Sequence, residues 1–205
     1  MFIGGEYSLQ LQRCDHLDVG MFLFMGSEVG GIRIIGTAEQ PSTGIRIHDG
    51  YIAKPGRDQA TRSGIIAKWV DGLTIESMQI DSWGYSAISI ADTRNLHIKT
   101  VKMTGSIESR FGIILAENVH DARIEEAIVM YTSESGIQLG TNLRNKDDDT
   151  LRWAVSNVTI GGCVLIKCML PIDVGSVRNL LIDHCTLFQP KSCAVGFRES
   201  AAPLK

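Results

Sequence analysis

The sequence predicts an all-β fold, a parallel β-helix of about seven coils in which each coil holds three short strands. Apolar residues recur in pairs spaced by two, which is strand periodicity because alternate side chains of a strand point to the same face. The whole pattern repeats every 23 to 25 residues where no insertion intervenes, a period typical of solenoids. No segment keeps a 3.6-residue period over three turns, which disfavours a solenoid of helices.

The clearest copy of the repeat is residues 86–105. Its first two apolar pairs are separated by a turn of five residues, and its last two by a corner of two residues. We therefore expect three strands per coil, with the apolar residues turned inward. In chain order the pairs are Ile88 and Ile90, Leu96 and Ile98, and Val101 and Met103.

The other coils follow the same order, with adjacent coils expected ~4.8 Å apart, the ordinary strand spacing. Each inward position then forms a column of similar residues along the solenoid axis. The first column is predicted to hold Leu9, Ile32, Ile65, Ile88, Ile113, Ile137 and Ile172, and Val195 begins an eighth coil. A small residue precedes the first strand of most coils, where we expect a tight bend that glycine tolerates. These residues are Gly31, Gly64, Ala87, Gly112 and Gly136.

Composition limits the partners and the location. The chain of 205 residues suits one domain spanning 1–205, and its net charge of −3 makes nucleic acid a poor partner. No apolar run approaches the ~20 residues of a membrane span, and the N-terminus lacks a signal-peptide pattern. Virion and extracellular sites of action both stay open. The five cysteines contain no CxxC pair, so we expect free and mostly buried thiols, with Cys163 and Cys185 in one inward column.

Three strands per coil with a two-residue corner between the second and third resembles the right-handed parallel β-helix of the pectate lyase and pectin lyase superfamily. That superfamily includes phage tailspike-type depolymerases. The resemblance covers essentially the whole chain and implies ligands along the first sheet and its flanking loops. It does not imply one activity, because the fold hosts many. Related enzymes usually have more coils and a cap, so we expect this chain to be part of a larger polypeptide or assembly.

Known enzyme motifs of that superfamily are missing from the matching positions. The NTD, DD, GHG and RIK signatures of polygalacturonase-type hydrolases do not occur there. Segment 182–184 (IDH) is similar to the WIDH motif of pectate lyases, but it lacks the tryptophan and is expected to form a corner.

One edge of the first sheet offers a candidate catalytic pair. Two residues beyond the first strand, successive coils place Trp69, Asp92 and Glu117 in one column. Asp92 and Glu117 would have backbones ~5 Å apart, within the carboxylate separation of a retaining glycosidase. Two like charges this close raise one pKa, as a general acid requires. We predict Asp92 and Glu117 as catalytic residues and Trp69 as a sugar-stacking residue. The alternative is that both acids are solvated turn residues.

The opposite edge carries Arg62, Tyr85 and Arg110, followed by Glu134. Arginine binds carboxylates and sulfates bidentately, so Arg62 and Arg110 suit an acidic polysaccharide. In a lyase reaction Tyr85 or Lys68 could remove the C5 proton of a uronate. The predicted substrate-binding set is Arg62, Lys68, Trp69, Tyr85 and Arg110. The alternative for the arginines is pairing with glutamate between coils.

The sheet between the edges is small and apolar at its centre, which suits a sugar face, a covering loop or a subunit interface. Its outward residues are Gln10, Arg33, Ile66, Ser89, Ile114, Gln138 and Asp173. Loops 53–63 and 140–156 frame the region. Aspartates 147–149 suggest calcium at first sight, but the EF-hand spacing is missing, so we predict no metal and no cofactor.

The leading functional hypothesis is a carbohydrate-active domain that binds, and could cleave, an acidic or complex polysaccharide by hydrolysis or elimination. The alternative is a non-catalytic structural or receptor-binding module of a larger assembly, such as a phage tail protein. A homotrimer is one arrangement for such an assembly.

Overall fold

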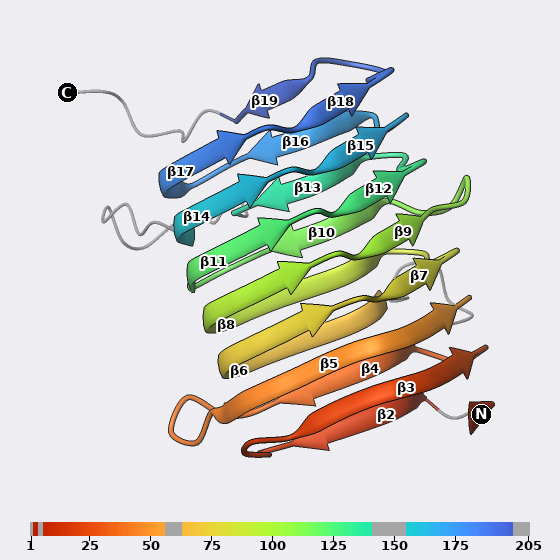
Figure 1. The fold of residues 1–205 in the computed structure, drawn as a ribbon, viewed down its shortest axis with the longest axis vertical. Helices are drawn as coiled ribbons and strands as arrows, with labels where there is room; N and C mark the ends of the chain where they lie inside the picture. The colour runs from red at the N-terminus through yellow and green to blue at the C-terminus, as the bar shows by residue number, and fades with distance from the viewer. Residues whose placement is uncertain (1, 4–5, 56–62, 141–154, 199–205) are drawn as a thin grey trace, which may run out of the picture.

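The structure, a computed structural model, describes residues 2–3, 6–55, 63–140 and 155–198. These residues form strands and no helix, and none of them belongs to a helix that could cross a membrane. All strand pairs are parallel, and the strands stack coil upon coil with β1 (Phe2–Ile3) and β19 (Val195–Phe197) at opposite ends of the solenoid (Figure 1). The predicted all-β parallel solenoid of about seven coils is confirmed.

Three faces can be followed along the solenoid, and in Figure 1 the first sheet lies behind the second. The first sheet contains β2 (Tyr7–Gln12), β4 (Gly30–Ile35), the starts of β6 (Ser63–Glu76) and β8 (Ser86–Lys99), β10 (Phe111–Leu115), β13 (Ser135–Leu139), β16 (Leu170–Val174) and β19. The second contains the starts of β3 (Asp18–Met25) and β5 (Ser42–Ala53), the ends of β6 and β8, β11 (Val119–Glu125), β14 (Val155–Gly161) and β17 (Val177–Asp183). The third contains β1, the ends of β3 and β5, β7 (Gln79–Asp81), β9 (Lys102–Thr104), β12 (Ile128–Met130), β15 (Val164–Ile166) and β18 (Thr186–Phe188).

The strand register confirms the predicted inward columns. Ile65 pairs with Ile88, Ile88 with Ile113, and Ile113 with Ile137. All four side chains are fully buried. Burial is less complete at the ends of the solenoid, where Leu9 in the first coil and Ile182 in the last are only partly buried. The core is therefore one continuous apolar column whose side chains are less completely buried at its two ends.

The connection between the first and second strands differs from the predicted five-residue turn. β6 and β8 each run unbroken through both strands, and Val70 of β6 still pairs with Thr93 of β8 between them. The chain bends at single residues with left-handed backbone angles, such as Asp92 (φ 45°) and Asn95 (φ 55°). A single left-handed residue turns the chain without removing the hydrogen bonds on either side, so two sharp corners replace a loop.

Residues with a left-handed backbone conformation recur at four corner positions of the coil. The first corner follows the first strand, the second precedes the second strand, the third joins the second and third strands, and the fourth follows the third strand. All twenty non-glycine and five glycine residues with positive φ in the described ranges lie at these corners. They are Arg13, Trp69, Asp92, Asn118 and Gly140 at the first; His16, Gly44, Gly72, Asn95, Asp121, Asn157 and Asn179 at the second; Met21, Asp49, Ser77, Thr100, Glu126, Gly162 and His184 at the third; and Gly26, Lys54, Ser82, Tyr131, Lys167 and Gln189 at the fourth.

The third corner is the predicted two-residue corner, and His184 confirms that segment 182–184 forms one. The glycines before the first strand have a different cause from the predicted bend. Gly64 lies within β6 and has no positive φ, but a Cβ there would be 2.6 Å from the carbonyl oxygen of Ala87. At Gly31 a Cβ would be 2.5 Å from the carbonyl oxygen of Gly64. Close approach between neighbouring coils therefore selects these glycines.

All five cysteines are free, as the sequence predicts, but only Cys163 and Cys168 are buried, whereas Cys14 and Cys185 are partly buried and Cys193 is exposed. Burial raises the pKa of the Cys163 thiol to about 12, which keeps it protonated and unreactive. The predicted insertion 140–156 follows β13, but its last two residues, Val155 and Ser156, belong to β14, and residues 141–154, which include the aspartates, lie outside the described residues.

Candidate functional site

The first predicted edge forms at the first corner. There the pairing between β8 and the following coil differs by one residue from the pairing that the sequence predicts. Lys68 pairs with Ala91, which places Trp69 beside Asp92. The next coil has one more residue at this corner, because Val119 pairs with Thr93 while Leu115 pairs with Ile90. As a result Asn118 rather than Glu117 takes the left-handed position next to Asp92.

Side-chain contacts unite four residues of this edge, which we call the lysine–tryptophan cluster: Lys68, Trp69, Asp92 and Asn118. Asn118 Nδ2 donates to Asp92 Oδ1 at 2.8 Å, and Lys68 Nζ lies 3.5 Å from Asp92 Oδ2. The same Nζ lies 4.1 Å from the centroid of the Trp69 ring, a cation–π distance. The Asp92 side chain is 17% exposed and Lys68 43%, so the cluster is fixed but reachable from solvent.

The two predicted catalytic carboxylates occupy different surroundings. Both oxygens of Asp92 face donors of neighbouring coils, Asn118 Nδ2 and Lys68 Nζ. Glu117 is exposed, and its carbonyl oxygen accepts from the Asp92 amide at 2.7 Å. Among the described residues its side chain makes no recorded contact with the cluster. Asn118 is the residue that sequence reasoning missed, although asparagine tolerates left-handed corners better than glutamate.

The second edge brings Tyr85 and Arg110 together as predicted, whereas Arg62 lies outside the described residues. The Arg110 guanidinium lies 5.3 Å from the ring centroids of both Tyr85 and Phe111, which pack edge to face at 5.3 Å. Arg110 Nε also donates to Glu134 Oε1 at 2.6 Å. Pairing between coils, the alternative for these arginines, is therefore present at Arg110.

Part of the first-sheet face between the edges is closed. Ile66 and Ser89 are half-buried, whereas Ile114, Gln138 and Asp173 are 3%, 9% and 7% exposed. A partly buried ion pair occupies the C-terminal part: Arg198 Nε donates to Asp173 Oδ1 at 2.8 Å. The open part of this face thus extends from Gln10 and Arg33 to Ile66 and Ser89, and its last two residues lie beside the lysine–tryptophan cluster.

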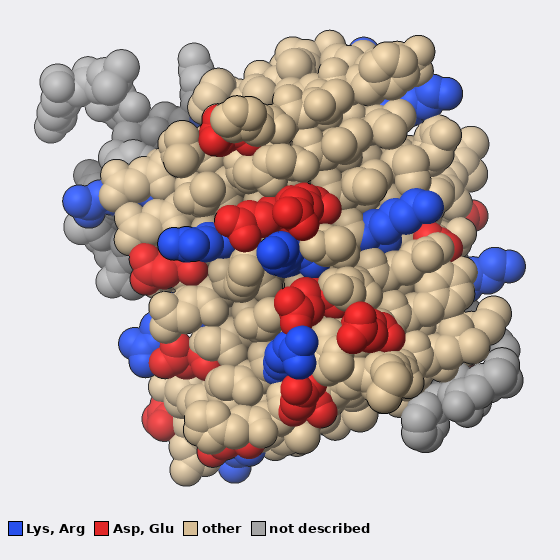
Figure 2. Space-filling view, viewed as in Figure 1, with Lys and Arg blue, Asp and Glu red and all other residues tan. Residues whose placement is uncertain are grey.

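The second sheet carries balanced charges rather than a basic patch, and Figure 2 shows both signs across the middle of this side. Arg46 contacts Asp18 at 3.0 Å and also pairs with Glu76. Hydrogen bonding to Arg46 lowers the pKa of Asp18. One coil further, Arg94 Nη2 donates to Asp71 Oδ2 at 2.6 Å and lowers the pKa of that carboxyl. These pairs join neighbouring coils.

The described residues contain no group of three or more histidine, cysteine or acidic side chains that could hold a metal ion. No model of a known protein family matches this chain, and no curated protein is significantly similar to it in sequence. The functional argument therefore rests on the fold and on the geometry of the two edges.

Proposed function

We propose that this solenoid binds an extended, acidic or complex polysaccharide at the lysine–tryptophan cluster. The observation that carries the proposal is the grouping of an indole ring, an ammonium, a carboxylate and an amide at one half-buried corner. Sugars present C–H faces that pack on aromatic rings and hydroxyls that bond to carboxylates and amides. This combination serves a sugar better than it serves a metal or a phosphate chain.

The second edge extends the proposed site. Tyr85 and Phe111 offer aromatic surface, and Arg110 offers a cation that an acidic sugar would share with Glu134. A five-residue strand such as β10 separates the edges by about 17 Å, so only a ligand of several sugar units would reach both. The pectin lyase-like resemblance implies ligands along this sheet and its flanking loops, which include both edges.

Binding is tested by titrating Trp69→Ala against a panel of acidic and neutral oligosaccharides. We expect at least a tenfold loss of affinity. Tyr131→Ala is the matched control, because Tyr131 is also a corner aromatic with a lysine, Lys167, whose Nζ lies 5.6 Å from its ring centroid. Equal effects of the two substitutions would contradict the proposed site.

Cleavage is a further part of the proposal and has a separate test. The panel is assayed for new reducing ends, which report hydrolysis, and for absorbance of unsaturated products, which reports elimination. If either product forms, the double variant Asp92→Asn with Glu117→Gln should abolish it. Full activity of that variant would exclude this pair, and absence of both products with retained binding would leave a binding module.

A second candidate, an assembly module, is favoured by one specific observation. Exposed hydrophobic residues lie on the outer face of the third sheet in two groups, Leu23 (37% exposed) and Met25 (38%) in the first coil, and Ile128 (36%) and Phe188 (54%) toward the C-terminal end. Apolar sheet faces pack on one another, so we propose that a second copy of this chain covers this face.

Solution mass measurement tests the assembly. An oligomer of the unmodified chain that dissociates in Ile128→Asp would support it. The matched control is Ile107→Asp, because Ile107 is 95% exposed and lies in the loop after β9, outside the strands of the third sheet. A monomer at all concentrations would rule out self-association through this face.

A further inference from the structure

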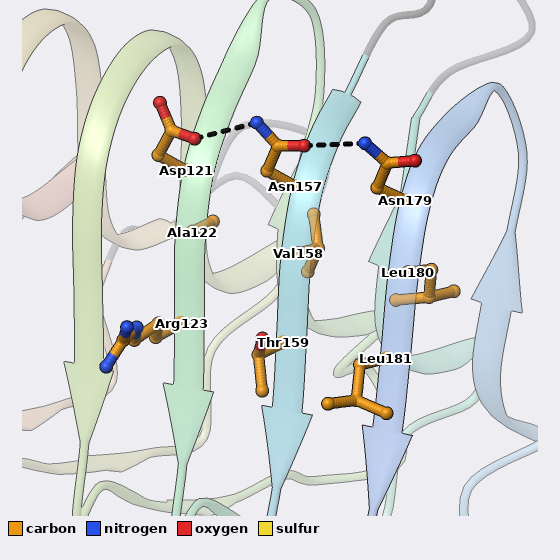
Figure 3. A pocket seen from close by; sticks show the side chains of 9 residues that line it. All are labelled: Asp121, Ala122, Arg123, Asn157, Val158, Thr159, Asn179, Leu180 and Leu181. Atoms are coloured by element: carbon orange, nitrogen blue, oxygen red, sulfur yellow. Dashed lines mark hydrogen bonds between the residues drawn. The ribbon is translucent and has the colours of Figure 1, made fainter.

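A hollow of about 480 Å³ crosses the second sheet over β11, β14 and β17 (Figure 3). Two rows of side chains border it, and the residues between the rows turn inward to the core. One row lies at the second corner and holds Asp121, Asn157 and Asn179. The other row lies two residues further along each strand and holds Arg123, Thr159 and Leu181.

The corner row is a fixed ladder of polar groups. Asn157 Nδ2 donates to Asp121 Oδ1 at 2.8 Å, and Asn179 Nδ2 donates to Asn157 Oδ1 at 2.9 Å (Figure 3). Each amide nitrogen has two hydrogens, so each asparagine keeps one N–H for another acceptor. Left-handed backbone angles of 54° to 58° hold all three side chains in the same direction. The ladder thus presents ordered donors along the solenoid axis.

The second row differs chemically at each coil. Leu181 is 56% exposed and adds an apolar surface at one end of the hollow. Arg123 is exposed at the other end, and among the described residues its side chain has no recorded hydrogen bond or ion pair. Arg46 and Arg94 on the same sheet both bind carboxylates. The two acids nearest to Arg123 in sequence have other partners: Glu125 accepts from His97 at 2.8 Å, and Asp121 accepts from Asn157. Arg123 is therefore a cation with its donors available.

We propose that this hollow binds a short stretch of an acidic linear glycan lying along the solenoid axis. The ladder repeats at the strand spacing of ~4.8 Å, which is close to the length of one pyranose unit, so each coil can face one sugar. Asn157 and Asn179 bond to hydroxyls, Leu181 contacts the C–H face of a ring, and Arg123 binds one carboxylate or sulfate. A dense polyanion such as nucleic acid fits poorly, because Asp121 borders the same hollow.

This site is separate from the lysine–tryptophan cluster, which lies at the first corner, although one coil contributes to both, with Asn118 three residues before Asp121. Its occupancy does not depend on the proposed function, although both sites favour a carbohydrate. A chain lying along the axis in this hollow would cross the direction proposed for the first sheet. Two such sites would let the protein hold separate parts of a branched or long polymer.

The test measures calorimetric affinity for oligogalacturonates, sulfated oligosaccharides and neutral oligosaccharides of matched length. We expect one of the two acidic classes to bind, and the class that binds shows whether the site takes a carboxylate or a sulfate. Arg123→Gln should reduce the affinity for that class at least tenfold. Arg178→Gln is the matched control, since Arg178 is exposed on β17 and also makes no recorded side-chain contact among the described residues, but lies outside the hollow.

A second readout follows the side-chain amide resonances of Asn157 and Asn179, which should shift on titration. These amide shifts report the hollow alone, so they should persist in Trp69→Ala even where that variant loses affinity at the lysine–tryptophan cluster, and the two sites can fail independently. Failure of every acidic probe to bind would overturn the proposal, as would equal affinities of Arg123→Gln and the unmodified chain. Leu181→Asp places a negative charge in the hollow and should therefore lower the affinity for acidic probes. An unchanged affinity in this variant would also contradict the proposal.

Discussion

At the scale of single residues, His48 has the most unusual charge environment. Its Nε2 lies 2.5 Å from Asp18 Oδ1 and its Nδ1 lies 2.7 Å from Asp49 Oδ2. The hydrogen bond to Asp49 is the main cause that raises the His48 pKa, and the bond to Asp18 adds to it, while burial and Arg46 oppose it. Both ring nitrogens donate only when the imidazole is charged, so the protonated form holds the first and second coils together.

The raised pKa gives a stability prediction with a defined direction. Protonated His48 stabilises the folded state below the unfolded pKa of about 6.5, and this contribution disappears as pH rises through the higher folded pKa. Thermal melts of the unmodified chain and of His48→Gln should therefore differ most near pH 6 and converge at about pH 9. A difference that does not change with pH would contradict the prediction, and an imidazole titration by NMR gives the folded pKa directly.

At the scale of the coil, the strands could be predicted and the corners could not. Inward residues such as Ile88 and Ile98 alternate with outward ones, and this alternation can be recognised in a single sequence. The corners lack a residue signature, because left-handed positions hold Trp69, Met21 and Glu126 as well as asparagine and glycine. The candidate edge was affected for the same reason: one additional corner residue puts Asn118 where equal spacing predicted Glu117.

Corner strain predicts an unusual order of stabilities at Met21. Its φ is 52° and its side chain is 88% exposed, so little packing offsets the left-handed conformation. An L-residue loses about 1–2 kcal/mol there, and glycine avoids this loss at an entropic cost of roughly 0.5–1 kcal/mol. Met21→Gly should therefore raise the free energy of unfolding by up to about 1 kcal/mol, and Met21→Val should lower it.

Urea denaturation measures this order, and Leu23→Gly is the control. Leu23 lies in the same strand with ordinary extended angles, so glycine there should destabilise by roughly 0.5–1 kcal/mol. The corner explanation fails if both glycine variants destabilise by the same amount.

At the scale of the whole molecule, stability should depend on how many coils cover a residue, because each coil contacts only its neighbours. Ile98 is fully buried between Ile75 and Ile124, whereas Ile182 pairs with Ile160 in the last complete coil and is only partly buried. Ile98→Ala should cost about 2–5 kcal/mol, and Ile182→Ala clearly less, since a partly buried side chain leaves a smaller cavity. Lys99→Ala, which changes the outward neighbour of Ile98, should stay within about 0.5 kcal/mol of the unmodified chain.

Urea denaturation of the three variants checks this gradient, and hydrogen exchange should show the last coil opening before the centre. If Ile182→Ala costs as much as Ile98→Ala, the proposed gradient is wrong and the last coil is covered in solution.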